Sequence, residues 1–301
     1  MRKIFLSAFA LFFVALACKQ ANADSETILS GNLDLLVDET LSPLIEDEVA
    51  VFESEYPGRV KLVVLPEKEL VLRLVNDTSA VAIMARNLTE NERKIFDKRK
   101  IIPKVTPFGR DAVVFLRNAN NRDSLLSLRE MAKFMRGEES AIKGIVLDNP
   151  NSGTLSKLME ATGVDTIPTA NVYSFKTTAE AIRYVSQNDG MVGVVAMNHI
   201  SQPTASTQAA LESISILSVQ PVNGGEYIYP SQDALAAGKY PLARDLFVVN
   251  CQGYSGLGVG VASFIAGEKG QRIMLKSGLL PIRIPGRNII IRNEIQNKTE
   301  N

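Results

Sequence analysis

The stretch RVKLVVLPEKELVLRLVNDTSAVAIMA, residues 59–85, is the part of the sequence from which the fold is predicted. RVKLVVLP has alternating and branched apolar residues and predicts a strand, EKELVLRLVND predicts a helix, and SAVAIMA predicts a buried strand. The same alternation of strands and helices continues along the chain. We therefore predict an α/β protein with a mainly parallel sheet that is covered by helices on both faces.

The alternation also predicts how the chain divides into lobes. Upstream, an apolar run is expected to form a strand that ends at Ser30-Gly31-Asn32, and a helical pattern follows between Leu41 and Phe52. The strand DAVVFLRN (111–118) leads into a second α/β unit, and the first unit needs the C-terminal segment for its completion. We expect two crossings, one at Asp111 to Arg117 and one between Gly224 and Asp233. Lobe 1 is then residues 24–114 and 225–301, and lobe 2 is residues 115–224.

The N-terminus carries an export signal. Arg2 and Lys3 precede an apolar run that is too short to span a membrane, which predicts a secretory signal peptide over residues 1–23. Ala15-Leu16-Ala17-Cys18 resembles a bacterial lipobox, in which the cysteine is lipidated, whereas cleavage after Ala23 would release the chain from Asp24. Both alternatives place the protein in the periplasm or cell envelope, and a lipid on Cys18 would be its one membrane anchor.

Composition argues against several classes of protein. The chain has 33 basic and 33 acidic residues, so no field that attracts nucleic acid is implied. Cys251 has no partner for a disulfide if Cys18 is lipidated or removed, and we expect it in the core. His199 is the one histidine, and no Cys/His cluster predicts a metal site. We find no nucleophile elbow, P-loop or dinucleotide fingerprint, and hence predict neither an enzyme nor a cofactor.

The segment DNPNSGTLSKLME (148–160) is the main candidate for a binding site. It places Ser152, Gly153 and Thr154 where a helical pattern begins. One interpretation is capping, in which the hydroxyl groups satisfy the free amides of the first turn. The other is anion binding, since free amides and the helix dipole hold phosphate or sulfate at such positions.

Several segments, in order, resemble the periplasmic substrate-binding proteins of bacterial phosphate ABC transporters. They are NSGTLSKLM (151–159), YPLARDLFVV (240–249) and FIAGEKGQRIMLKSGLLPI (264–282), with RNLTENERKIF (86–96) and GMVGVV (190–195) in support. The resemblance implies two α/β lobes that are joined by two crossings and close on a ligand in the cleft. It also implies capture of phosphate or a similar small oxyanion, delivery to an inner-membrane ABC permease, and a monomeric protein.

The resemblance assigns the Ser-Gly-Thr of the family, which donates hydrogen bonds to phosphate oxygens, to Ser152, Gly153 and Thr154. Two positions depart from the family. Asp148 stands where many members have Arg, and Arg86 lies near the place of an Asp that accepts a phosphate proton. We infer exchanged charges, with Arg86 as the cation and Asp148 accepting the proton or orienting Arg86. The alternatives are a solvated helix-start residue for Arg86 and a turn-forming residue for Asp148.

Other candidates lie around the first strand and the first crossing. Gly31 and Asn32 occupy the loop where the first-lobe amides of the family approach the ligand. Asp38 or Thr40 would either cap the next helix or contact the ligand. Arg110 is a second candidate cation. Because the Arg before Ser152 is missing, a second function stays open, namely an anchored scaffold or sensor of the same fold that does not serve transport.

Overall fold

The computed structural model describes residues 26–284, so the predicted signal peptide and Cys18 lie outside the described residues. The strands are β1 (Asn32–Asp38), β2 (Arg59–Leu65), β3 (Val81–Met84), β4 (Lys104–Asn118), β5 (Leu125–Ser127), β6 (Gly144–Leu147), β7 (Val172–Ser174), β8 (Met191–Ala196), β9 (Ile214–Ile216), β10 (Ser218–Gln220), β11 (Ala243–Asn250) and β12 (Leu280–Pro281). The helices are η1 (Glu39–Leu41), α2 (Ser42–Glu55), α3 (Glu67–Asn76), α4 (Glu90–Lys98), α5 (Leu128–Met135), α6 (Gly153–Thr162), α7 (Thr178–Gln187), α8 (Asn198–Ser201), α9 (Ala205–Leu211), α10 (Gln232–Ala236), α11 (Leu257–Ile265) and α12 (Glu268–Lys276).

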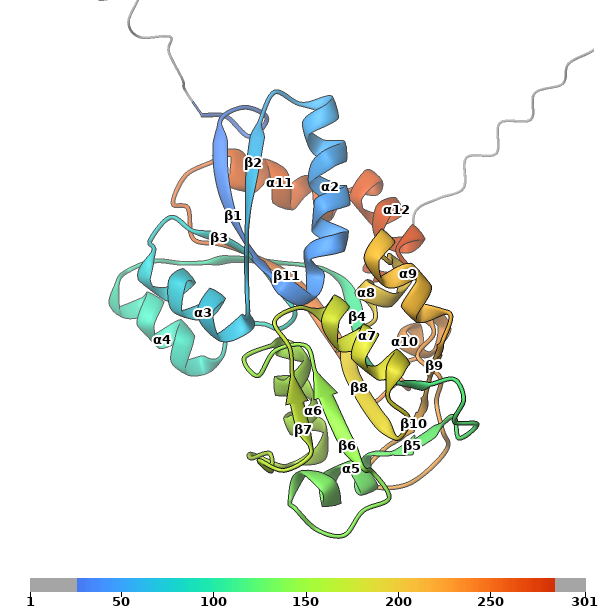
Figure 1. Ribbon diagram of the computed structural model, residues 1–301. Helices are drawn as coiled ribbons and strands as arrows, with labels where there is room; N and C mark the ends of the chain where they lie inside the picture. The colour runs from blue at the N-terminus through green and yellow to red at the C-terminus, as the bar shows by residue number, and fades with distance from the viewer. Residues whose placement is uncertain (1–25, 285–301) are drawn as a thin grey trace, which may run out of the picture.

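Lobe 1 is a sheet between two layers of helices (Figure 1). Its strands run in the order β2-β1-β3-β11-β4, and the first three pair in parallel. Side chains alternate between the two faces of a strand. On β1, Leu35 therefore packs with α2 and α11, whereas Leu36 packs on the other face with α3 and α4. Cys251 is buried in this second layer, as predicted.

Lobe 2 is built around the second half of β4. This half pairs with β8, and β6 and β7 follow in parallel. Helices α5, α6 and α7 contribute to a single core, and that core also contains Leu235 and Leu242 from the segment before β11. The two-lobe α/β fold predicted from the sequence is therefore confirmed.

Strand β4 connects the two lobes. Its residues from Lys104 to Ala112 pair with β11 in the sheet of lobe 1, and those from Val113 to Leu116 pair with β8 in the sheet of lobe 2. The chain returns to lobe 1 through β11, which lies antiparallel beside β4. The two strands that cross between the lobes are thus direct neighbours, and side chains that face each other across them lie at the junction.

The first strand differs from its prediction. The apolar run before Ser30 was expected to form the strand, but β1 begins at Asn32 and ends at Asp38. The alternation of Leu33, Leu35 and Val37 on one face was the stronger signal. The residues that follow β1 at its carboxyl end are hence Glu39 and Thr40, and not Gly31 and Asn32.

Candidate functional site

The turn after β1 brings two buried polar residues to the junction. The Asp38 carboxylate caps η1, because its Oδ1 accepts hydrogen bonds from the Thr40 amide at 3.0 Å and from Thr40 Oγ1 at 2.8 Å. Asp38 is 1 % exposed, and its other oxygen, Oδ2, has no hydrogen-bond partner among the described residues. Capping therefore uses only half of this carboxylate, and the other half is available to a ligand.

Arg244 supplies the cation at the junction. It lies opposite Asp111 in the register of β11 and β4, and its Nη2 pairs with the Asp111 carboxylate and donates to Thr40 Oγ1 at 3.3 Å. Arg244 is 4 % exposed, yet its Nε and Nη1 have no acceptor within the described part of the chain. A buried guanidinium with two free donors is suited to an oxyanion, which accepts two parallel hydrogen bonds.

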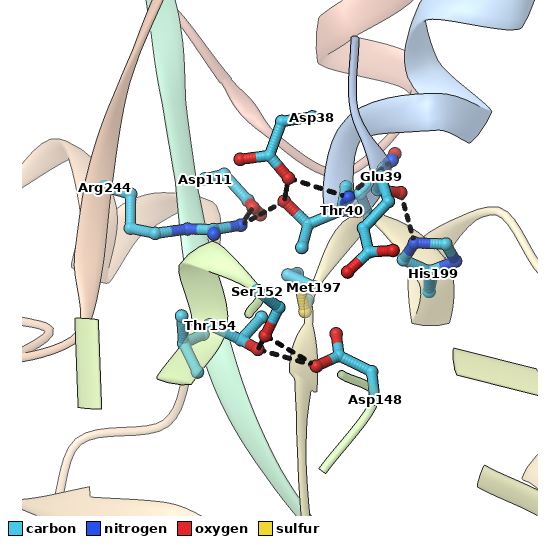
Figure 2. A network of polar contacts seen from close by, with 12 residues as sticks. Asp38, Glu39, Thr40, Asp111, Asp148, Ser152, Thr154, Met197, His199 and Arg244 are labelled. Carbon is cyan, nitrogen blue, oxygen red and sulfur yellow. Dashed lines mark hydrogen bonds and ion pairs between the residues drawn. The ribbon is translucent and has the colours of Figure 1, made fainter. Parts of the chain in front are cut away.

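The N-terminus of α6 faces this group from lobe 2. Ser152 caps the helix, since its Oγ accepts from the Leu155 amide at 3.5 Å. Asp148 Oδ1 is 2.9 Å from Ser152 Oγ and 2.8 Å from Thr154 Oγ1, and the two hydroxyl oxygens lie 2.6 Å apart (Figure 2). Asp148 thus organises both hydroxyl groups. Burial raises the pKa of Asp148 to about 6, although these hydroxyl groups act in the opposite direction.

Gly153 marks the point where the two lobes meet. A Cβ atom at this residue would lie 2.9 Å from Glu67 Oε2, 3.1 Å from Asp38 Oδ2 and 3.2 Å from Arg244 Nη1. Three polar groups of lobe 1 therefore converge on the first residue of α6. A pocket of about 380 Å³ lies beside this point and has Arg86, Gly153 and Arg244 in its lining. A larger side chain at this position would press on these three groups, so the position of Gly153 defines the candidate ligand site.

Carboxylates outnumber cations at the site. The Glu39 carboxylate points across the junction toward Asp148 (Figure 2), and its Oε1 is buried without a partner among the described residues. Burial, followed by the charges of Asp148 and Asp38, raises the pKa of Glu39 to about 7. His199 adds no positive charge to the site near neutral pH, because burial lowers its pKa to about 4. A ligand here must bring hydrogen-bond donors as well as negative charge.

Arg86 lies in the wall of the pocket but is already paired. Its Nε is 3.1 Å from Glu67 Oε1, and its Nη1 and Nη2 each donate to Glu92 at 2.9 Å. The guanidinium is thus neutralised from two sides. Arg86 was predicted as a site residue and is in the pocket lining, but the guanidinium with donors that have no acceptor within the described part of the chain is that of Arg244.

Three other candidates lie away from Gly153. Gly31 and Asn32 are at the start of β1 and Asp38 is at its end, a separation of about 20 Å for an extended segment. Arg110 pairs with Asp245 at 2.7 Å and donates to the Leu235 carbonyl. Since neighbouring residues of a strand point to opposite faces, Asp111 faces the junction and Arg110 faces away from it.

Arg244 was not predicted as a site residue. It lies in the quoted segment YPLARDLFVV, where the apolar residues of the strand gave the signal for its structure. The sequence pattern did indicate that Arg244 is buried. Arg244, Leu246 and Val248 share one face of β11, and Leu246 and Val248 are fully buried on that face. An arginine on a buried face needs a partner or a ligand.

The architecture agrees with the comparison to known proteins. A family model described as a PBP superfamily domain matches residues 22–269. The chain belongs to the PBP superfamily. No protein of curated function matches its sequence.

Several solved structures share the fold. One is a substrate-binding protein assigned to a phosphate ABC transporter of Clostridium perfringens, with bound phosphate: 17% identity over 84% of this chain and 100% of the other, TM-score 0.68. A second is an ABC-type phosphate transport receptor from Vibrio cholerae: 13% identity, 83% and 100% coverage, TM-score 0.63. A third is full-length OxyR from Pseudomonas aeruginosa: 13% identity, 88% and 76% coverage, TM-score 0.53. At these identities the likeness shows the fold.

Two further features of the described residues bear on other kinds of site. Among residues 26–284, no group of three or more His, Cys, Asp or Glu side chains has an arrangement that would hold a metal ion. No helix in that part of the chain is both long and apolar enough to cross a membrane.

Proposed function

We propose that the protein is an extracytoplasmic solute-binding protein that captures phosphate, or a similar protonated oxyanion, between its lobes and delivers it to an ABC importer. The observation that carries the proposal is the convergence of Arg244 Nη1, Asp38 Oδ2 and the first turn of α6 on the point beside Gly153. Each lobe holds half of the site, so a ligand that contacts both halves stabilises the closed arrangement.

The donors and acceptors at the site suit phosphate better than sulfate. Arg244 and the amides of α6 would bind the negatively charged oxygens. The free oxygens of Asp38 and Asp148 can only accept hydrogen bonds while they are ionised, so they need a ligand that carries protons. Phosphate carries one or two protons near neutral pH, whereas sulfate carries none. The same carboxylates would repel sulfate.

The structural neighbours support the same class of ligand, because two of them are described as phosphate transport proteins. The proposed cation is Arg244 on the crossing strand β11, in place of Arg86. We further propose that the protein is a monomer and is exported by the signal at residues 1–23, with or without a lipid on Cys18. The lobe boundaries that we propose differ from the predicted ones, because the core of lobe 2 extends to Leu242 and the chain returns to lobe 1 at β11. Catalysis plays no part in this proposal.

One observation favours a second function, that of a scaffold or sensor of the same fold. The hydroxyl groups of Ser152 and Thr154 are directed at Asp148, and Arg244 is paired with Asp111, so much of the network is satisfied within the protein. A scaffold or sensor of the same fold would need no more than this. The fold is shared with OxyR as well as with transport proteins.

Calorimetric titration of residues 24–301 with phosphate and with sulfate at pH 7 tests the proposal. We expect micromolar or tighter phosphate binding and no sulfate binding. The double variant Arg244→Gln/Asp111→Asn removes the cation together with the carboxylate that it pairs with, and we expect it to weaken phosphate binding by about 100-fold or more. Arg110→Gln is the matched control on the outward face, with unchanged affinity. A folded wild-type protein that binds neither anion would favour the scaffold or sensor.

A further inference from the structure

A carboxylate of lobe 1 lies against the first turn of α6. Glu67 is the first residue of α3, and it is 6 % exposed although it follows the surface turn at Pro66. Its Oε1 accepts a hydrogen bond from Ser156 Oγ at 3.3 Å, and its Oε2 lies 2.9 Å from the Cβ position of Gly153. Glu67 thus reaches across the junction to two residues of the same helical turn.

The next residue makes a second link between the lobes. The Lys68 amide donates to the Asn151 carbonyl at 3.4 Å, just before α6 begins. On the side of lobe 1, Arg86 Nε lies 3.1 Å from Glu67 Oε1. Glu67 is therefore held between a cation of its own lobe and the helix terminus of the other lobe.

The first turn of α6 contributes no carboxylate to its own N-terminus, and Asp148, the carboxylate of lobe 2 that contacts this turn, is bonded to the hydroxyl groups of Ser152 and Thr154. By contrast, α4 and α7 both have a capping box with Glu92 and Glu180 in the first turn. Negative charge is favourable at a helix N-terminus, because free amides and the helix dipole face it. Glu67 provides that charge to α6 from the other lobe, at the position where an anionic ligand would provide it.

We propose that Glu67 is an internal competitor of the ligand. Its carboxylate takes the place of an anionic oxygen at α6, helps to hold the lobes together, and is displaced toward Arg86 when the anion binds. This inference rests on the proposed function, since it requires the anion to bind at Gly153. Two negative charges cannot share one helix terminus without mutual repulsion, so Glu67 lowers the affinity of the site and eases release of the ligand.

The test compares Glu67→Gln with Glu69→Gln, which removes the same charge from an exposed position of α3. Phosphate affinity is measured by calorimetry at pH 7. We expect Glu67→Gln to bind phosphate about tenfold more tightly than wild type and Glu69→Gln to bind as wild type does. Glu67→Asp keeps the charge beside Arg86 but is one methylene shorter, so it should also bind more tightly.

A second measurement reads the lobes directly. Small-angle X-ray scattering without added phosphate should give a larger radius of gyration for Glu67→Gln than for wild type, and phosphate should make the two equal. Equal or weaker phosphate binding by Glu67→Gln, with binding by wild type intact, would overturn the competitor role and leave the proposed function standing. Absence of phosphate binding in the folded wild-type protein would overturn both.

Discussion

Helices α4 and α6 both follow a strand and a short turn, and both begin at a hydroxyl cap, but their first turns are completed differently. At α4 the Glu92 amide donates to Thr89 Oγ1 at 3.3 Å, and the Thr89 amide donates back to Glu92 Oε2 at 2.7 Å. At α6 the cap from Ser152 is longer, Asp148 of the same lobe accepts from the hydroxyl groups of Ser152 and Thr154, and Glu67 and Asp38 of the other lobe lie beside Gly153.

The difference shows which kind of helix N-terminus can bind a ligand. A first turn that is satisfied by its own side chains has no amide to offer and no reason to depend on a distant part of the chain. A first turn that is satisfied from another lobe loses that support when the lobes separate. The second kind of terminus therefore couples ligand contact to lobe movement.

The largest expected effect comes from filling the space at the start of α6. Gly153→Ala places a methyl group within about 3 Å of Glu67, Asp38 and Arg244, and lobe closure would be blocked. We expect phosphate affinity to fall by about 100-fold while thermal stability changes little, because the residue is not in the core of either lobe. Titration calorimetry and a melting curve measure the two quantities.

Gly253→Ala is the control for this change, since its added methyl group would meet open space. At the matching first position of α4, Glu90→Ala should leave phosphate affinity unchanged. Wild-type phosphate affinity in Gly153→Ala would show that the ligand does not bind beside Gly153. It would also show that α6 is no more involved in binding than α4.

The next effect is a difference in pH dependence. Burial raises the pKa of Asp148 to about 6, so its contribution to stability is complete at low pH and is lost as the pH rises through about 6. At α4, burial acts to raise the pKa of Glu92, but the hydrogen bonds from Arg86 and Thr89 and the charge of Arg86 together outweigh it and lower this pKa. The contribution of Glu92 to stability is therefore present at neutral pH and is lost on acidification. The two carboxylates should therefore act on stability in opposite directions.

Melting temperatures from pH 4 to pH 8 test this. We expect Asp148→Asn to raise the melting temperature at pH 7.5 by roughly 5 °C and to change it little at pH 4. Glu92→Gln should lower it at pH 7.5 and have a smaller effect at pH 4. If Asp148→Asn destabilises the protein equally at both pH values, the carboxylate serves mainly as an acceptor for Ser152 and Thr154, and the pH argument is wrong.

The smallest effect concerns the cap of α4. Thr89→Ala removes one side of the capping box and should cost about 1 kcal/mol of unfolding free energy, with no change in phosphate affinity. Urea denaturation and calorimetry provide the two values. A loss of affinity in this variant would mean that α4 also takes part in the site, through Arg86.

The sequence was most informative where local patterns act alone. Apolar periodicity located α2, and Thr89 and Glu92 in RNLTENERKIF have the three-residue spacing that is typical of a capping box, which α4 has. Capping was one of the two interpretations of Ser152, and the residue does cap α6. Each of these features depends on residues within a few positions of one another, so tertiary structure had little opportunity to change the outcome.

Features that depend on pairing across the chain were predicted less well. Gly31 and Asn32 were placed at the wrong end of the first strand, because a short apolar run does not show where a strand begins. Arg86 and Arg110 each have an acidic partner that only the fold brings near, and Arg244 faces inward beside Asp111, 133 residues away. These long-range pairs decide which arginine keeps hydrogen-bond donors for a ligand.

The route of the chain through the two lobes also has a consequence for folding. The core of lobe 2 draws its residues from one continuous segment, Ala112 to Leu242. The core of lobe 1 begins at Leu33 but also needs Leu246, Val248 and residues of α11 and α12. When the chain is made from its N-terminus, all core residues of lobe 2 are present before those of lobe 1 are complete. The apolar faces of the N-terminal strands therefore stay uncovered until the C-terminal segment is available. We expect aggregation to occur mainly at this stage of folding.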